Sequence, residues 1–330
     1  MKVLVTGATG FLGKAIVDEL LQNEFEVYTT GKTLRQEDLP NYLPADLTVS
    51  ESFPELEKIG EIGAIIHSAG LAHQFGETSA EKFLQVNAEG TRKAANLAVR
   101  LKAEKFILIS SVAVYGEALE GKSPGDGFEE NLQCQPIGFY AESKLEAERI
   151  AAEICGKSRI DLTILRPSTI IGEGDRGNLA RLIEAVDRRR FVWIGGGKNS
   201  KSLVYKTDVA RACLHFLGDS GKTKKDKPEV YNVTAAPVPM REIVRQIEKV
   251  LGRSVPPLRL PGRLLQKSLN IIGRASRVKK LLRIAGTLDK WLSDDVFSGE
   301  KIHLETGFQT RVNPIEGIRR ETVHYRRNQK

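Results

Sequence analysis

Three residue types in this chain have the spacing that proton transfer requires. Ser110-Ser111 ends an apolar segment, and Tyr140 and Lys144 are four residues apart in a helical pattern, so they share one face of a helix. A phenol with a pKa of about 10 is a poor base at neutral pH, but an adjacent ammonium favours the phenolate. A serine hydroxyl can hydrogen-bond a reacting oxygen, so the set suits proton transfer at a carbinol while a hydride moves to or from a nicotinamide. By itself, the Tyr–Lys spacing is more typical of an ordinary helix surface.

A glycine-rich segment lies between the first apolar run and the first helical pattern. Its glycines follow a Gly-x-x-Gly-x-x-Gly spacing. Glycine lets the backbone turn tightly and approach a ligand, and the next helix offers free N–H groups and the positive end of its dipole to a pyrophosphate. We therefore predict a dinucleotide-binding turn with contacts from Gly7, Thr9, Gly10, Phe11, Leu12 and Gly13.

The second apolar run ends at Gly31, where NAD-binding sites usually carry an acid for the adenosine ribose. Lys32 and Arg35 follow instead. A 2′-phosphate is repelled by an acid and attracted by these cations, so the pattern favours NADP(H) over NAD(H). The alternative is that Lys32 and Arg35 form a solvated loop face. Asp46, after a short third strand, could accept a hydrogen bond from the adenine amine or could simply close a turn.

Apolar runs and helical patterns alternate through the first 170 residues. The runs, each predicted to be a strand, are residues 3–5, 26–30, 64–67, 106–109 and 162–165. Helices are predicted at 11–22, 79–102, 140–155, 179–189, 207–217, 239–251 and 263–284. The alternation predicts an α/β fold with a doubly wound parallel sheet, the Rossmann fold. We expect residues 1–167, plus roughly 202–234, to form the dinucleotide-binding domain. Residues 168–201 and 235–330 would form a smaller C-terminal α/β substrate domain.

Composition narrows the class of protein further. The 330 residues are 41% apolar, enough for a core, and carry a net charge of +8. The excess lies in residues 249–288, which hold ten Lys or Arg and no acid, so a globally basic nucleic-acid binder is a poor description. The 3 Cys are far apart, which predicts neither disulfides nor a metal site. No apolar stretch is long enough to span a membrane and no signal peptide is evident, so we expect a cytoplasmic protein.

In combination, these motifs resemble the extended short-chain dehydrogenase/reductase family, also described as the NAD(P)-dependent epimerase/dehydratase family. The matching segments are residues 6–13, 67–70, 87–91, 110–116, 140–144 and 165–167. The resemblance implies that Tyr140 is the acid and base, that Lys144 binds the nicotinamide ribose and tunes Tyr140, and that Ser111 polarises the substrate oxygen. Further cofactor contacts that it implies are Thr30, Leu47, Ser68, Ala69, Gly70, Asn87, Pro167 and Thr169.

Within the family, the chain looks most like nucleotide-sugar 4-epimerases and 4-ketoreductases. Residues 176–179 resemble the segment that meets a nucleotide diphosphate, and the implied substrate contacts are Ser111, Val112, Asn178 and Lys201. A lysine at 201 takes the place of an arginine in related epimerases and offers a point charge rather than a fork. Val112-Ala113 replaces the Asp-Glu of 4,6-dehydratases, which excludes that reaction. The missing acid at Gly31 favours an NADP(H)-dependent 4-ketoreductase over an epimerase with bound NAD.

Other interpretations remain open. A hydrophobic substrate would place the chain among the 3β-hydroxysteroid or dihydroflavonol enzymes. A cofactor-binding regulator without turnover is the non-enzymatic alternative, although it would have no need for the Ser–Tyr–Lys set. The family suggests a homodimer. Residues 259–284 interleave cations with aliphatic residues, which fits a lid or subunit contact, a weakly bound interfacial helix at the inner membrane face, or an ordinary amphipathic helix.

Overall fold

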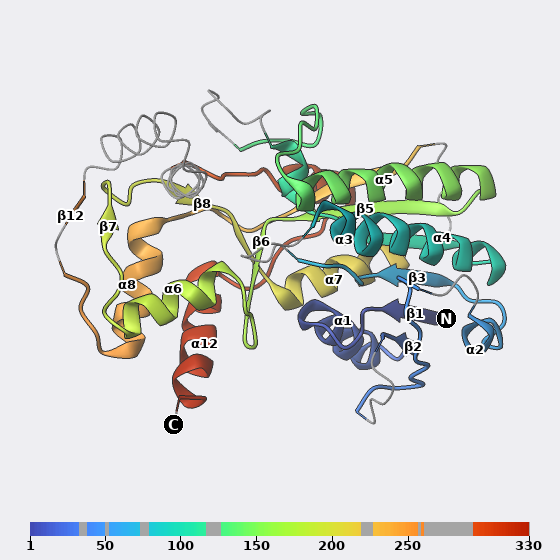
Figure 1. Ribbon diagram of the computed structural model, residues 1–330, viewed down its shortest axis with the longest axis horizontal. Coiled ribbons are helices and arrows are strands. Elements are labelled where there is room, and N and C mark those ends of the chain that lie inside the picture. The colour runs from blue at the N-terminus through green and yellow to red at the C-terminus, as the bar shows by residue number, and fades with distance from the viewer. Residues whose placement is uncertain are drawn as a thin grey trace.

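The computed structural model describes residues 1–32, 38–49, 53–72, 79–116, 127–218, 227–256, 259–260 and 293–329. Figure 1 shows a body of strands and helices that contains the N-terminus and, beside it, a smaller lobe that contains the C-terminal helix.

Six parallel strands form the central sheet. They are β1 (Lys2–Thr6), β2 (Glu26–Thr30), β3 (Ala64–His67), β4 (Lys105–Ile109), β5 (Asp161–Pro167) and β10 (Glu229–Val233). The order β10-β5-β4-β3-β1-β2 brings all their carboxyl ends to one edge. It also changes direction between β1 and β3, which is where doubly wound sheets bind ligands. This arrangement confirms the predicted parallel Rossmann sheet.

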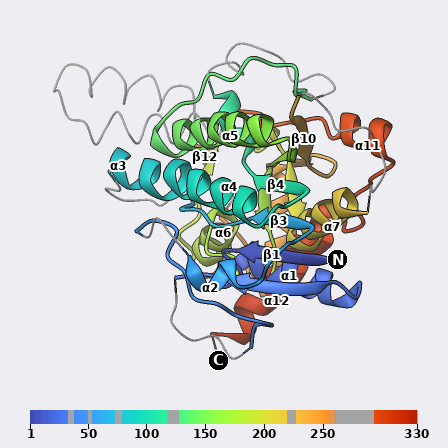
Figure 2. The ribbon, with the colours of Figure 1, turned by 90° about the vertical axis from the view of Figure 1, so that its right-hand side faces the viewer.

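Helices cover both faces of this sheet (Figure 2). α1 (Phe11–Gln22) and α7 (Lys206–Leu217) pack together on one face, and α4 (Gly90–Arg100) and α5 (Phe139–Ser158) pack together on the other. Each face of the sheet has its own hydrophobic core, and alternate residues of β1 point into the two cores. Val3 and Val5 lie in the core beneath α1 and α7, and Leu4 lies in the core beneath α4 and α5. The short helix α2 (Pro54–Glu57) also packs into the second core. Burial on both faces explains why the strands are almost wholly apolar.

The helix expected over residues 79–102 is divided into three parts. α3 (Ala80–Phe83) is capped by Ser79, whose Oγ accepts a hydrogen bond from Lys82 N at 3.2 Å. A π-helix, η1 (Leu84–Glu89), follows and leads into α4. Single π-turns inside helices are rare and often mark functional positions. Here the π-turn contains Asn87.

The smaller lobe has its own core between three helices. These are α6 (Asn178–Asp187), α8 (Met240–Leu251) and α12 (Pro314–Arg327). Short strand pairs complete the lobe: β6 (Thr169–Ile171) with β9 (Leu203–Tyr205), β8 (Ser200–Lys201) with β11 (Val238–Pro239), and β7 (Trp193–Ile194) with β12 (Arg259–Leu260). A 3₁₀ turn, η2 (Val112–Tyr115), follows β4, and α11 (Glu300–Thr306) lies near the edge strand β10.

Two expectations from the sequence need comment. The short third strand before Asp46 is wrong, because the chain there forms only one bridge, between Thr29 and Tyr42. Leu43 N and Ala45 N donate to Thr29 O and Gly31 O, so the segment follows β2 through a few hydrogen bonds without forming a strand. The helix predicted at 263–284 lies outside the described residues, as do residues 257–258 and 261–288 of the basic stretch 249–288. Within the described ranges, no helix combines the length and apolar character that a membrane crossing requires.

Candidate active site

Ser111 and Tyr140 meet at the carboxyl edge of the sheet. Ser111 follows β4, caps η2 with its side chain, and accepts a hydrogen bond from Ala113 N at 3.2 Å. Tyr140 lies in the first turn of α5, which begins after Gly138. The Ser111 hydroxyl hydrogen-bonds the Tyr140 phenol, and the Phe83 ring lies edge-on to Tyr140 with centroids 6.1 Å apart. The structure therefore brings together two of the three residues predicted to carry the chemistry.

The surroundings of Tyr140 change the pKa of its phenol in the direction opposite to the one that a general base needs. Burial raises the pKa of its phenol above the usual value, and the hydrogen bond from Ser111 only partly opposes this effect. Burial and this hydrogen bond therefore do not by themselves give the lowered pKa that the sequence argument invoked.

Lys144 lies one helical turn beyond Tyr140 and points into the same edge. Its Nζ donates a hydrogen bond to the Ile109 carbonyl at 2.9 Å, and its side chain is 8% exposed. Burial lowers the pKa of Lys144 to about 8, and the nearby carboxylate of Glu148 opposes the fall. Because this pKa lies close to neutral pH, the charges around Lys144 determine whether its amine is protonated.

Asn87 joins three segments around this group. Its Oδ1 accepts from Leu71 N at 2.7 Å, and its Nδ2 donates to Leu71 O at 3.1 Å and to Ser143 Oγ at 2.9 Å. Ser143 in turn donates to the Tyr140 carbonyl at 2.8 Å. The segment Ser68-Ala69-Gly70 passes beside it, and a Cβ on Gly70 would come 3.1 Å from both Asn87 Oδ1 and Lys144 Nζ. A methyl group at this point would therefore have to displace both side chains by a few tenths of an ångström.

The glycine turn has the shape of a cofactor cradle. Gly7 has φ +70°, and a Cβ on it would come 2.6 Å from the backbone of Ala69. A Cβ on Gly13 would come 2.1 Å from Gly7 O. No side chain caps α1 at Gly10, so the first N–H groups of the helix are available to an anion. These features fit the pyrophosphate of a dinucleotide, and Thr9, Phe11 and Leu12 lie in the same turn.

The space around Gly31, at the end of β2, is tight. A Cβ there would come 3.3 Å from the Thr9 side chain and from the Tyr42 hydroxyl, which donates to Gly31 O at 2.9 Å. Lys32 is exposed at the end of this strand, whereas Arg35 lies outside the described residues. Thr30 and Leu47 are buried.

Asp46 closes a turn. Its Oδ1 accepts from Thr48 N at 2.8 Å and from Thr48 Oγ1 at 2.6 Å. Although burial opposes the shift, these hydrogen bonds and the charges of Lys32 and Lys93 lower the pKa of its carboxyl. Of the two roles that the sequence left open, the turn role is thus observed, and the adenine contact stays a prediction.

The predicted substrate contacts differ in exposure and in the partners that they already have. Asn178 is exposed at the start of α6, Val112 is half-buried in η2, and Pro167 and Thr169 flank the end of β5. Lys201 is already engaged, because its Nζ contacts Asp295 Oδ2 at 2.6 Å and Ser293 O at 2.9 Å. Its charge is largely neutralised, so the expected diphosphate contact would have to compete with Asp295.

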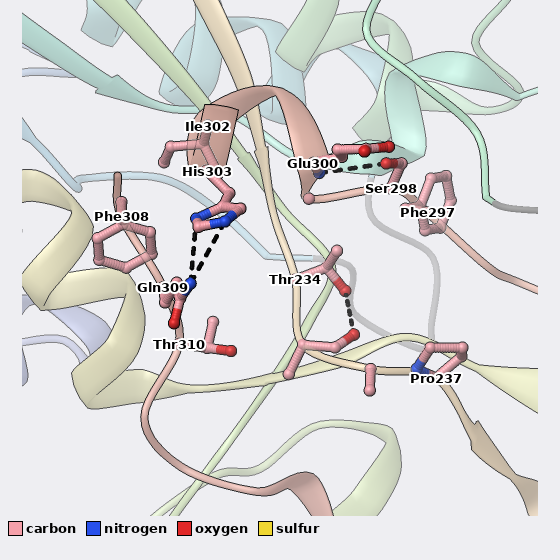
Figure 3. A pocket seen from close by; sticks show the side chains of 13 residues that line it. Thr234, Pro237, Phe297, Ser298, Glu300, Ile302, His303, Phe308, Gln309 and Thr310 are labelled. Carbon is pink, nitrogen blue, oxygen red and sulfur yellow. Dashed lines mark hydrogen bonds between the residues drawn. The ribbon is translucent and has the colours of Figure 1, made fainter. Parts of the chain in front are cut away.

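A cavity of about 430 Å³ lies between the segment that follows β10, residues 234–237, and residues of the segment 297–310. Figure 3 shows Thr234 and Pro237 on one side of it, and His303, Phe308 and Gln309 on the other. None of the residues predicted to do chemistry lines it.

Sequence reasoning missed a buried polar chain beneath the site. It runs through Ser110, Glu148, Arg166, Tyr115 and Asn232. One signal could have revealed it, since Glu148 continues the four-residue spacing of Tyr140 and Lys144. His67 is a second neighbour that was not singled out: burial and the charge of Lys144 lower its pKa to about 3, so its ring is neutral.

Comparisons with known proteins agree with this geometry. Residues 3–234 match the NAD dependent epimerase/dehydratase family, so the chain belongs to that family. N-acetyl-alpha-D-glucosaminyl-diphospho-ditrans,octacis-undecaprenol 4-epimerase of Escherichia coli O157:H7 is 26% identical, over 98% of this chain and 94% of its own. UDP-glucose 4-epimerase of Vibrio cholerae is 27% identical, over 87% of this chain and 86% of its own.

The fold is shared with solved relatives. UDP-glucuronic acid 4-epimerase from Bacillus cereus, solved in complex with NAD, superposes with a TM-score of 0.75 at 22% identity and 100% coverage of both chains. The solved relative shows the fold, and the family match identifies the chain as an enzyme of the extended short-chain dehydrogenase/reductase type, as the motifs predicted.

Proposed function

We propose that the protein is a 4-epimerase acting on a sugar that is carried by a diphosphate. The observation that carries this proposal is the hydrogen-bonded Ser111–Tyr140 pair with Lys144 on the same helix face, beside the glycine cradle. Membership of the epimerase/dehydratase family and the two epimerases described above support the reaction type.

The side chains divide the work as follows. Tyr140 accepts the proton of the sugar hydroxyl and later returns it to the same oxygen. Ser111 donates a hydrogen bond to that oxygen, which stabilises the charge that develops there. A bound nicotinamide cofactor supplies the acceptor and donor of hydride. Lys144 binds the nicotinamide ribose and tunes Tyr140, and Asn87 holds the segments around this cofactor site in place.

The diphosphate carrier is either a nucleoside or a polyprenol. Arg176 and Asn178 are exposed at the start of α6 and available to a diphosphate, while Lys201 is paired with Asp295. The E. coli relative acts on a polyprenyl diphosphate sugar, as its name states, and it matches this chain almost from end to end. The Vibrio relative supports the nucleoside carrier instead, because its name gives a UDP-sugar as the substrate.

The residues expected to contact the cofactor's adenosine favour a second candidate, an NADP(H)-dependent 4-ketoreductase. Gly31 stands where an NAD site usually has an acid, and Lys32 offers a cation to a 2′-phosphate. A net reductase exchanges its cofactor in every turnover, whereas an epimerase regenerates it in place.

Two measurements separate the candidates. The purified protein is assayed with UDP-N-acetylglucosamine and with N-acetylglucosaminyl-diphospho-undecaprenol, each with NAD⁺ or NADP⁺. Epimerised product without net consumption of cofactor supports the 4-epimerase, and failure with both sugars contradicts it. Affinities for the two cofactors are then compared with those of Lys32→Ala. Tenfold tighter NAD(H) binding by the unaltered enzyme would remove the NADP(H) preference.

A further inference from the structure

Three side chains on one face of α5 contact three consecutive residues at the end of β4. Tyr140 bonds to Ser111, and the Lys144 ammonium bonds to the Ile109 carbonyl at 2.9 Å. The third contact continues the series, because Ser110 Oγ donates to Glu148 Oε1 at 2.5 Å. The four-residue spacing thus brings one face of the helix against residues 109–111, which are met in the order 111, 109 and 110.

Glu148 is itself fixed from the other side by Arg166 on β5. Arg166 Nε donates to Glu148 Oε1 at 2.9 Å, and Nη2 donates to Oε2 at 2.6 Å. The two side chains are only 7% and 6% exposed. A bidentate pair of this kind holds the carboxylate in one orientation.

The support continues to the edge of the sheet. Arg166 Nη1 donates to Tyr115 Oη at 3.1 Å, and its guanidinium lies 5.0 Å from the centre of the Tyr115 ring. Tyr115 Oη then donates to Asn232 Oδ1 on β10 at 2.8 Å. Glu148 is therefore the point at which β4, α5 and this cross-sheet chain meet.

Stability alone is a poor explanation for the arrangement. Burying an ion pair costs desolvation that its attraction often only just offsets, and apolar residues of similar volume are frequently as stable. The pair instead places a fixed negative charge one turn from Lys144 and a fixed acceptor under Ser110.

We propose that Glu148 is a positioning residue of the reaction, which sets the place of Ser111 through Ser110 and keeps Lys144 charged. This inference rests on the proposed roles of Ser111, Tyr140 and Lys144. The titratable groups that interact with Lys144 are the neutral ring of His67 on β3 and the carboxylate of Glu148 on α5, with Arg166 on β5 behind that carboxylate, and Tyr140 precedes Lys144 by one turn of the same helix. Glu148 is thus the negative charge that opposes the loss of a proton from Lys144.

Two variants of the full-length chain test the two halves of the proposal. Ser110→Ala removes the contact under Ser111 and leaves the Glu148–Arg166 pair intact. Loosening Ser111 weakens the hydrogen bond that lowers the pKa of Tyr140, so in the NAD⁺-saturated enzyme that pKa rises by about half a pH unit or more. Tyrosinate absorbance, taken as the difference from Tyr140→Phe, measures it.

Glu148→Gln keeps the shape of the side chain and removes its charge. The pKa of Lys144 then falls by about one pH unit, because the opposing charge is gone. The ¹³C shift of labelled lysine, assigned with Lys144→Met, follows this titration. The matched control is Glu153→Gln, whose carboxylate pairs with Lys157 on the exposed face of α5. It should change neither value.

The outcomes are distinct. If Ser110→Ala and Glu148→Gln both fold and titrate like the unaltered enzyme, the positioning role is wrong. If Glu148→Gln does not fold, Ser110→Ala still decides the effect on Tyr140. Full turnover by Tyr140→Phe would instead overturn the proposed function and leave these titrations standing as structural effects.

Discussion

The residue that should do the chemistry is, in its own surroundings, a weaker acid than free tyrosine. Burial raises the pKa of Tyr140, and one hydrogen bond from Ser111 opposes that rise. The phenol therefore holds its proton until further positive charge arrives, which ties proton transfer to the loaded site. The phenol group makes Tyr140 able to transfer a proton, and the charges around it determine when that proton can leave.

Replacing Tyr140 by Phe removes the proton carrier and keeps the ring. We expect kcat to fall by about 10²–10⁴-fold, the usual contribution of a positioned acid or base, with cofactor affinity unchanged. Steady-state kinetics and a cofactor titration measure both. Tyr325→Phe is the control, because that hydroxyl bonds Asp187 in the smaller lobe and should be dispensable for turnover. A variant that loses cofactor affinity and kcat together would mean that Tyr140 is mainly structural.

At the scale of elements, the glycine turn is held in place by backbone contacts. Gly13 packs against Gly7 O so closely that a methyl group would come 2.1 Å from it. A Gly13→Ala variant must therefore move α1 away from the turn. We expect cofactor affinity to fall at least tenfold, together with a lower melting temperature.

Gly156 provides the matched control for that substitution. It lies in α5, and a Cβ added to it would have nothing within 4 Å. Gly156→Ala should leave cofactor affinity unchanged and stabilise the protein by about 0.5–1 kcal/mol, since alanine favours the helix. Isothermal titration and thermal melts compare the two variants. Equal losses of affinity in both would contradict the close-packing argument.

Sequence patterns predicted the elements better than the contacts between them. β2, β3 and α1 have the predicted bounds, because apolar runs and helical periodicity report burial directly. The π-turn at Asn87 was not predicted, since the same apolar spacing fits an unbroken helix. The pairing of Lys201 with Asp295 was missed for a related reason: the partners are 94 residues apart, and no local pattern reports such a meeting.

At the scale of the whole molecule, the last helix reaches back to the segment that precedes α6. Glu321 on α12 accepts a hydrogen bond from Gly172 N at 2.9 Å, across 149 residues of chain. Its side chain is 3% exposed, and among the described residues its Oε1 has no partner. Burial, followed by the charges of Asp175 and Glu173, raises the pKa of Glu321 to about 8. The carboxyl is therefore protonated near neutral pH.

This raised pKa makes the stability of the lobe fall with rising pH. Between the ordinary value of about 4.5 and about 8, the folded state holds a proton that the unfolded chain has released. The free energy of unfolding therefore decreases across this window. Glu321→Gln imitates the protonated carboxyl, so it should match the unaltered protein near pH 5 and exceed it near pH 8 by about 2–4 kcal/mol.

Urea unfolding at the two pH values measures the difference. Glu242→Gln, on the exposed face of α8, serves as the control and should show the same small effect at both. A Glu321→Gln variant that is destabilised equally at pH 5 and pH 8 would mean that Glu321 is ionised throughout, and that the carboxylate itself holds Gly172. A higher free energy of unfolding for Glu321→Gln at pH 8 only would instead show that α12 binds the segment before α6 through a protonated carboxyl. The contact between this helix and that segment then weakens as the pH rises.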